Sequence, residues 1–232
     1  MKSMEELISE ARSSIGNDWK VRDARKVPSL ESLSLTGKDA AEFEATVLYA
    51  DMNGSTQLVR GYKNWFAAGV YKTYLHTASE IIRNNAGVVT AFDGDRVMAV
   101  FVGGRKNTSA VKSAMQIVFA INQLNKFIAE KFPDATYKIR HSIGVDTGHL
   151  FVVRAGVRDS NDLVWVGEPA NVAAKLTTMD DATYPIWITR KVYDNMNDSV
   201  RFSSQKELMW TAVQELTFGR NVLKSSWWWR VD

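Results

Sequence analysis

The stretch TVLYADMNGST, residues 46 to 56, begins as an apolar, β-rich run and places Asp51 at the end of that run, directly before a Gly-Ser-Thr turn. Burying an unpaired carboxylate is so costly that a folded chain either neutralises it or gives it a partner. A carboxylate at the end of a strand, beside a loop that contains glycine, is commonly a ligand of a cation. The stretch therefore predicts a buried strand that ends in a candidate cation ligand.

Hydrophobic periodicity predicts the elements that follow this strand. Apolar residues recur at helical spacing between Gln57 and Asn84, which predicts one long helix. The β-rich runs GVVTAF (87–92) and RVMAVFV (96–102) flank Asp-Gly-Asp and predict a hairpin. A second apolar stripe predicts a helix over 107–128.

The runs YKIRHSIGVD (137–146) and HLFVVRAGV (149–157) predict a further pair of strands around Thr147 and Gly148. The resulting order is strand, helix, strand, strand, helix, strand. This is the βαββαβ pattern of a ferredoxin-like α+β domain.

This order brings two acidic segments together. A right-handed crossover through the first helix makes the second strand parallel to the first, so the turn that contains Asp93 and Asp95 lies at the same sheet edge as Asp51. Converging carboxylates repel one another unless they share a proton or bind cations, and hard oxygen ligands suit magnesium or manganese. The alternative is that Asp93 and Asp95 only form the turn, since Asp-Gly is a favoured hairpin sequence.

The segment MNGST (52–56) supplies groups that suit phosphate. Gly54 allows the backbone to come close, Ser55 and Thr56 offer hydroxyls, and Asn53 belongs to the same candidate nucleotide-binding segment. The free N–H groups at the start of the following helix favour an anion, although the same residues could form an ordinary helix cap. Beside a cation site, the segment indicates a two-metal phosphoryl-transfer enzyme that acts on a nucleoside triphosphate.

Four blocks of the sequence resemble those of class III nucleotidyl cyclases and occur in the same order: VLYADMNGST, FDGDRVMAVF, IRHSIGVDTGHLFV and VWVGEPANVAAKL. The resemblance implies the catalytic domain of that class, with extra strands and helices at its C-terminal end. It also implies that Asp51 and Asp95 are metal ligands, that Met52 contributes its backbone carbonyl, and that each site binds two Mn²⁺ or Mg²⁺ ions.

The fourth block contains two further candidate catalytic residues. The resemblance implies that Asn171 and Lys175 support the transition state, and a helix starting near Pro169 would present both from one face because they are four residues apart. The family usually has arginine where this chain has Lys175, which keeps the charge but loses the bidentate fork. Alternatively, Asn171 is a residue of the helix start and Lys175 is solvated.

The positions that read the base depart from the usual pattern. Adenylate cyclases of this family generally have a lysine and an aspartate where this chain has Ala91 and Val164. Neither residue can read a base edge through a charged hydrogen bond, so the usual selection of ATP or GTP is not encoded here. Tyr49 is bulky and narrows the predicted base pocket, which favours a smaller base.

The opening of the chain, with VRDARKVPSLESLSL (21–35) ahead of the first block, resembles the pyrimidine nucleotidyl cyclases of bacterial antiphage Pycsar systems. This resemblance implies that the chain makes cyclic UMP or cyclic CMP as a second messenger for a separate effector, and UTP is expected ahead of CTP. Arg96 is then a candidate contact for the base or a phosphate, or else a solvent-facing strand residue. The alternatives for the whole chain are a purine cyclase with an atypical base pocket and a catalytically silent nucleotide-binding module.

The resemblance also implies a homodimer with shared active sites, in which one subunit supplies Asp51 and Asp95 and its partner supplies Asn171 and Lys175. Arg220 and Lys224 are the late basic residues that could reach a triphosphate. His76, His141 and His149 lack a spaced partner and are not expected to bind a metal.

Composition bounds the remaining possibilities. The 232 residues suit an N-terminal extension over 1–40 and a cyclase domain over 41–232. The chain has no cysteine, which fits a reducing compartment such as the cytoplasm. Its 29 Lys and Arg are scattered among 26 acids, so nucleic acid is not an expected partner. No apolar stretch is long enough for a signal peptide or membrane span, so a membrane is not an expected partner either.

Overall fold

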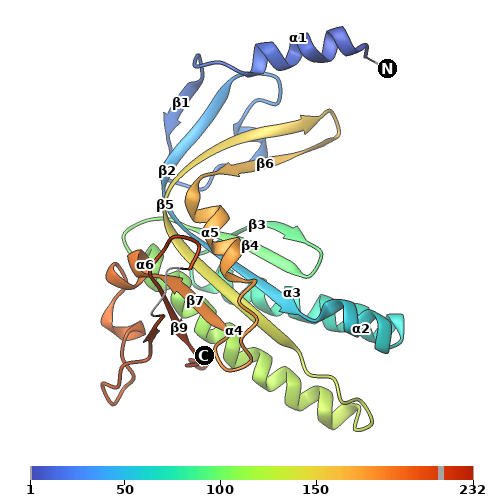
Figure 1. The fold of residues 1–232 in the computed structure, drawn as a ribbon, viewed down its shortest axis with the longest axis vertical. Helices are drawn as coiled ribbons and strands as arrows, with labels where there is room; N and C mark the ends of the chain where they lie inside the picture. Colours follow the sequence, from blue (N-terminus) through green and yellow to red (C-terminus); the bar gives the residue numbers. More distant parts are fainter. Residues whose placement is uncertain (1, 214–216, 232) are drawn as a thin grey trace.

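The computed structural model describes residues 2–213 and 217–231. Within these residues a nine-stranded sheet has the order β3-β4-β2-β5-β7-β9-β8, with β1 paired to β2 and β6 paired to β5 (Figure 1). The strands are β1 Lys20–Asp23, β2 Asp39–Asn53, β3 Val88–Asp93, β4 Arg96–Phe101, β5 Arg140–Val157, β6 Ser160–Val166, β7 Ile186–Thr189, β8 Thr211–Ala212 and β9 Val222–Ser225. The helices are α1 Met4–Ser14, α2 Ser55–Gly61, α3 Asn64–Asn84, α4 Lys106–Lys131, α5 Glu168–Leu176 and α6 Arg190–Asp194, with short 3-10 turns at Leu30–Ser32 and Asp198–Val200.

The central strands confirm the ferredoxin-like pattern. Strand β2 is antiparallel to both β4 and β5, and β3 is antiparallel to β4, so β2 and β3 run in the same direction. Alternation along β2 decides what each face carries. Leu48, Ala50 and Met52 enter the larger core with the buried residues of α3 and α4, whereas Val47 and Tyr49 lie with the residues that α5 covers.

The predicted long helix over 57–84 is wrong in one respect, because it is two helices. Helix α2 ends at Gly61, and Tyr62 follows in an extended conformation before α3 begins. The Tyr62 ring stacks on Phe66 and meets Tyr137 edge-on. The periodicity remained correct in α3, whose predicted apolar positions are buried.

The predicted pair of strands around Thr147 and Gly148 is also wrong, because β5 runs through both residues without a turn. Thr147 pairs with Thr46 and Gly148 with Ala45 in the ladder between β2 and β5. A Cβ at Gly148 would lie 3.1 Å from Pro169 Cγ and 3.2 Å from Lys191 Nζ, so β5 passes close to the start of α5 here. The actual hairpin follows Val157 and joins β5 to β6.

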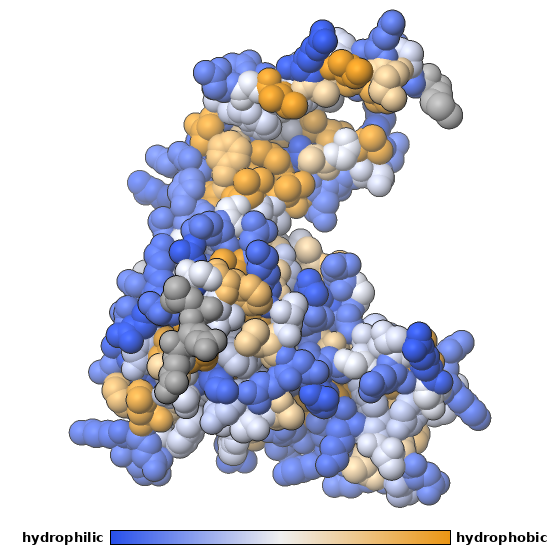
Figure 2. Space-filling view, viewed as in Figure 1, coloured by the Kyte–Doolittle hydropathy of each residue, from blue (hydrophilic) through white to orange (hydrophobic). Residues whose placement is uncertain are grey.

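The N-terminal segment is partly integrated with the sheet. Helix α1 has no buried residue, but β1 pairs in parallel with the first residues of β2, and Leu33 is buried in the smaller core. With the β5–β6 hairpin, these elements form an upper lobe on which Figure 2 shows a concentration of hydrophobic residues. Its exposed apolar side chains include Leu7, Ile8, Ile15, Val157, Val164 and Val166.

Gly144 sets the distance between β5 and α5. A Cβ on Gly144 would lie 2.1 Å from the carbonyl oxygen of Ala173 and 2.7 Å from Leu176 Cβ. Gly144→Ala should lower the free energy of unfolding by about 1–3 kcal/mol, because the α5 backbone must move to admit the methyl group. Urea denaturation measures the change.

The matched control is Gly69→Ala in α3, where a Cβ would meet nothing within 4 Å. This substitution should raise the free energy of unfolding by about 0.5–1 kcal/mol through helix propensity. Two substitutions with the same sign would contradict the packing explanation for Gly144.

Candidate active site

Asp51, near the C-terminal end of β2, and the Asp-Gly-Asp turn between β3 and β4 lie at the same end of the sheet. Asp51 is the cross-strand partner of Arg96 on β4, and Asp93 at the end of β3 pairs with the same arginine. Arg96 Nη2 donates a hydrogen bond to Asp51 Oδ2 at 3.0 Å, and the two side chains are 30% and 17% exposed. Topology therefore brings the predicted acidic residues together.

The electrostatics at this edge suit a cation. Burial raises the pKa of Asp51, the hydrogen bond from Arg96 opposes this change, and the charge of Asp95 raises the pKa further. Within the described residues, Asp95 Oδ2 is buried and has no hydrogen-bond partner. An unpartnered carboxylate oxygen beside a second carboxylate fits a hard divalent ion.

Protein side chains would supply only part of the coordination. Among residues 2–213 and 217–231, no group of three or more histidines or acids could hold a metal ion. Asp51 and Asp95, with the Met52 carbonyl, would hold the ions, and water or substrate oxygens would complete the shell. This division is normal for Mg²⁺ in phosphoryl-transfer sites.

Tyr49 lies on the same face of β2 as Asp51, two residues away. Its hydroxyl donates to Met98 Sδ at 3.1 Å, and the Arg96 guanidinium lies 5.9 Å from the centre of its ring. Ala91 on β3 pairs with the same Met98. Burial raises the pKa of the Tyr49 hydroxyl, which keeps it neutral.

The MNGST segment turns from β2 into α2. Gly54 is the N-cap in the left-handed conformation, with φ of 75°. Helix α2 begins at Ser55, so neither Ser55 nor Thr56 is the N-cap. Asn53 ends β2, and its carboxamide donates to Ser142 Oγ and Asp180 Oδ1.

Asn171 and Lys175 both lie on the exposed side of α5. Both are exposed, whereas the buried residues of α5 pack on β2 and β5. Lys175 lies over the Phe218 ring at 5.9 Å and is not among the charged groups that shift the pKa of Asp51. Within one chain, the two predicted sets of catalytic residues therefore face different surroundings.

The two late basic residues have different environments. Arg220 pairs with Glu168, one turn before Asn171 on the exposed side of α5. Lys224 donates to Asp181 at 3.1 Å and lies 4.1 Å from the centre of the Tyr184 ring. Of these two basic residues, Arg220 is the one that contacts a residue of α5.

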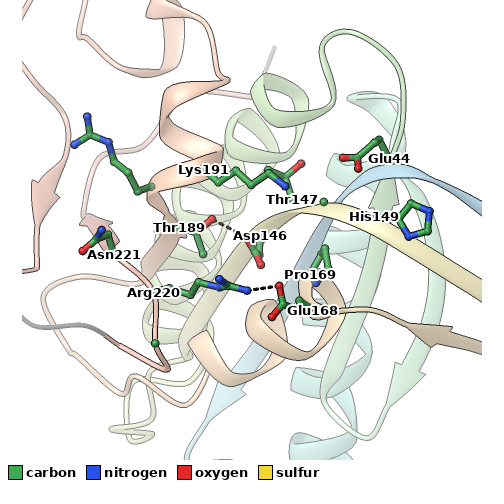
Figure 3. A pocket seen from close by; sticks show the side chains of 13 residues that line it. Glu44, Asp146, Thr147, His149, Glu168, Pro169, Thr189, Lys191, Arg220 and Asn221 are labelled. Carbon is green, nitrogen blue, oxygen red and sulfur yellow. Dashed lines mark hydrogen bonds and ion pairs between the residues drawn. The ribbon is translucent and has the colours of Figure 1, made fainter.

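A cavity of approximately 550 Å³ borders Arg220 and the start of α5 (Figure 3). Its buried acid is Asp146, which accepts from Thr189 Oγ1 at 2.6 Å and whose pKa is raised by burial. Glu44 lines the cavity seven positions before Asp51 on β2. At about 3.3 Å per strand residue, roughly 23 Å of β2 lies between the two positions, measured along the strand.

Sequence reasoning missed the polar residues that pack against the acidic edge. Thr177, at the end of α5, lies close enough to Asp51 to lower the pKa of that carboxyl, while its hydroxyl donates to the Ala174 carbonyl at 2.8 Å. Burial holds the pKa of Tyr74 well above its ordinary value, and the charges of Asp51 and Asp95 raise it further. A threonine after a helix and a tyrosine on an apolar stripe carry no distinguishing signal, so only the fold identifies them.

His141 lies on β5 beneath this edge and opposite Met52. It is 8% exposed, its Nε2 has no partner within the described residues, and burial lowers its pKa from 6.5 to about 4. Between pH 6.5 and 4, His141 therefore binds a proton in the unfolded chain but not in the folded chain. The contribution of neutral His141 to the free energy of unfolding is fully present above pH 6.5. It should fall by on the order of 3 kcal/mol as the pH falls toward 4.

Urea denaturation at a series of pH values tests this expectation for the metal-free protein. His141→Leu should flatten the pH dependence between 6.5 and 4, whereas His76→Leu on the exposed side of α3 should leave it unchanged. An unchanged slope in His141→Leu would assign the acid sensitivity to other groups.

Comparison with known proteins places this geometry in a family. No family model matches the chain. A curated relative from Xanthomonas perforans, named uridylate cyclase, is 42% identical over 230 residues, which cover 98% of each chain. This chain belongs to the uridylate cyclase family. A uridylate cyclase from Burkholderia cepacia is also 42% identical, over 92% of each chain.

The fold of this uridylate cyclase family member agrees with solved cyclase structures. The adenylyl cyclase CyaB from P. aeruginosa superimposes with a TM-score of 0.69 at 19% sequence identity, covering 80% of this chain and 95% of CyaB. This likeness confirms the predicted class III cyclase catalytic fold. With the family membership, it identifies the chain as a nucleotidyl cyclase, which is a lyase.

No helix among the described residues is long and apolar enough to cross a membrane.

Proposed function

We propose that this enzyme converts UTP to 3′,5′-cyclic UMP and pyrophosphate, with two Mn²⁺ or Mg²⁺ ions in each site. The observation that carries the proposal is the 42% identity, over nearly the whole chain, to a relative named uridylate cyclase. The convergence of Asp51 and Asp95, with an unpartnered oxygen on Asp95, supports the metal site.

In the reaction, the ribose 3′-oxygen forms a bond to the α-phosphorus as the bond to pyrophosphate breaks, and the hydroxyl proton leaves to solvent. When bound, the divalent ions would lower the pKa of the 3′-hydroxyl and neutralise negative charge on the phosphates. Asp51, Asp95 and the Met52 carbonyl hold the ions. The turn at Gly54, with the Ser55 and Thr56 hydroxyls, receives phosphate oxygens at the start of α2.

The α5 residues act on the transition state. Asn171 orients the ribose, and Lys175 offsets the negative charge that develops on the phosphoryl oxygens. Because both are on the exposed side of α5, we assign them to the site of a partner subunit. A two-fold homodimer would complete two such sites, since an isologous interface repeats every contact.

Base selection rests on Tyr49 and Arg96. The Tyr49 ring narrows the face beside Asp51, and Arg96 is positioned by both Asp51 and Tyr49 to reach a base edge or a phosphate. Ala91 offers no charged group to a purine. The names of the relatives favour UTP over CTP.

The cyclic nucleotide would act as a second messenger in the cytoplasm, binding a separate effector in antiphage defence. The resemblance of the segment before β2 to the cyclases of Pycsar systems supports this role. The chain requires no contact with the effector, because the product connects the two proteins.

Incubating the purified protein with each of the four ribonucleoside triphosphates and Mn²⁺, followed by mass spectrometry, tests the function. Cyclic UMP should be the dominant product, with pyrophosphate in equal amount. Product from ATP or GTP alone would overturn the pyrimidine assignment. Absence of product from all four would overturn the enzyme assignment.

A further inference from the structure

The turn that follows α5, residues 177–181, is fastened to the strand end that carries Asp51. Ser142 is the cross-strand partner of Asp51 on β5, and its hydroxyl donates to the Met179 carbonyl at 3.2 Å. Asn53, two residues beyond Asp51, donates to Ser142 Oγ at 2.9 Å and to Asp180 Oδ1 at 2.8 Å. We call this turn and its contacts with Asn53 and Ser142 the brace.

The brace is a hydrogen-bonded polar network that runs from buried Ser142 to exposed Asp180. Ser142 is fully buried, and it accepts from Asn53 while donating to Met179, so its single proton and an acceptor position are both used. Arg140 adds an ion pair to Asp180 from the outer side. A buried network in which each group has a partner fixes one arrangement of its elements.

The brace holds a helix as well as a strand. Thr177, 2% exposed, directly follows Leu176, the last residue of α5. The same helix is pressed on β5 at Gly144, where no side chain separates them. Six residues of helix, about 9 Å, separate Asn171 from the brace. Helix α5 therefore cannot shift without disturbing the strand end that carries Asp51.

We propose that Asn53 is a positioning residue that couples the two half-sites of one chain. Through the brace it ties Asp51, which serves one active site, to α5, whose Asn171 and Lys175 serve the other. This inference rests on the shared-site dimer proposed above. It gives the Asn53 carboxamide a role inside the chain instead of a direct contact with the nucleotide.

A heterodimer separates coupling from a local effect on Asp51. One chain carries Asp51→Ala and supplies only Asn171 and Lys175 to the intact site, while its partner carries Asn171→Ala and supplies Asp51. Adding Asn53→Ala to the first chain should lower kcat of the intact site about tenfold or more, because α5 loses its position by a fraction of an ångström. The KM for nucleotide should change little, since the groups that bind phosphate and base are on the other chain.

An unchanged kcat would overturn the coupling, because Asn53 would then act only on Asp51 of its own chain. If the heterodimer is inactive before Asn53 is changed although subunit exchange is confirmed, the shared-site dimer fails and the coupling fails with it. The two failures are therefore distinguishable.

Rescue and control variants exclude a general loss of structure. In the first chain, Asp180→Asn keeps a side-chain oxygen that can accept from Asn53 and should keep kcat, whereas Asp180→Ala removes that acceptor and should lower kcat. Asn195→Ala removes another side-chain amide, which donates to the Lys191 carbonyl at 2.8 Å, and should leave kcat unchanged. Should Asn53→Ala unfold, Asp180→Ala combined with Ser142→Ala removes both acceptors of Asn53, and full kcat in that variant would equally overturn the coupling.

Discussion

Asp95→Ala is expected to lower kcat/KM by about 10³-fold or more, because a metal ligand stabilises transition-state charge by several kcal/mol. The fold should remain intact, since Asp95 lies in a turn at the sheet edge and its buried oxygen has no partner within the described residues. The charge of Asp95 raises the pKa of Asp51, so the variant should unfold at the same temperature as the wild type or higher when no metal is present. Steady-state kinetics with Mn²⁺, thermal unfolding and Mn²⁺ titration by electron paramagnetic resonance measure these effects.

Asp93→Ala is the matched control. Asp93 belongs to the same turn and is exposed, so its removal should change kcat/KM and Mn²⁺ affinity only slightly. Full activity in Asp95→Ala would place the metal site elsewhere. Equal losses in both variants would indicate that the shape of the turn, and not a ligand, is what matters.

Mixing subunits should restore activity to two inactive variants. Asp51→Ala and Asn171→Ala are each expected to be inactive alone, because every site lacks one group. After exchange, half of the dimers are mixed and each mixed dimer has one intact site, so the mixture should recover about one quarter of wild-type activity. Tagged subunits measure the exchange, and a cyclase assay measures the recovery.

The control mixture combines Asp51→Ala with Asp95→Ala. Both residues belong to the same half-site, so no intact site can form in any dimer, and activity should stay absent. Failure of the first mixture with confirmed exchange would place Asp51 and Asn171 in one site of a single chain. Recovery in the control mixture would contradict the proposed division of residues.

Sequence patterns predicted the centre of the fold well where short-range physics controls it. Alternation along β2 and the Asp-Gly hairpin were sufficient to bring Asp51 and Asp95 together, because the crossover rule leaves one arrangement of those strands. Two local patterns misled. Gly148 suggests a turn but lies within β5, where it pairs with Ala45, and the stripe over 57–84 does not reveal the interruption after Gly61.

The brace could not be predicted because its partners are remote in sequence. The two acceptors of Asn53 lie 89 and 127 residues away. An asparagine ahead of a Gly-Ser-Thr turn suggests a loop contact with a ligand, and only the tertiary structure reveals Ser142 and Asp180 beside it. The same limit applies to Arg220, whose partner Glu168 lies 52 residues away in the sequence.

The pairing of β2 with β5 affects how the chain folds during its synthesis on the ribosome. Its thirteen pairs, from Ala41 with Val152 to Asn53 with Arg140, join residues roughly a hundred positions apart, and such non-local pairing slows folding. Helices α3 and α4 can form while the chain is emerging, but β2 cannot acquire this neighbour until β5 has been synthesised. During that interval one edge of β2 is open beside Asp51, and the nascent chain is most prone to associate with other chains through that edge.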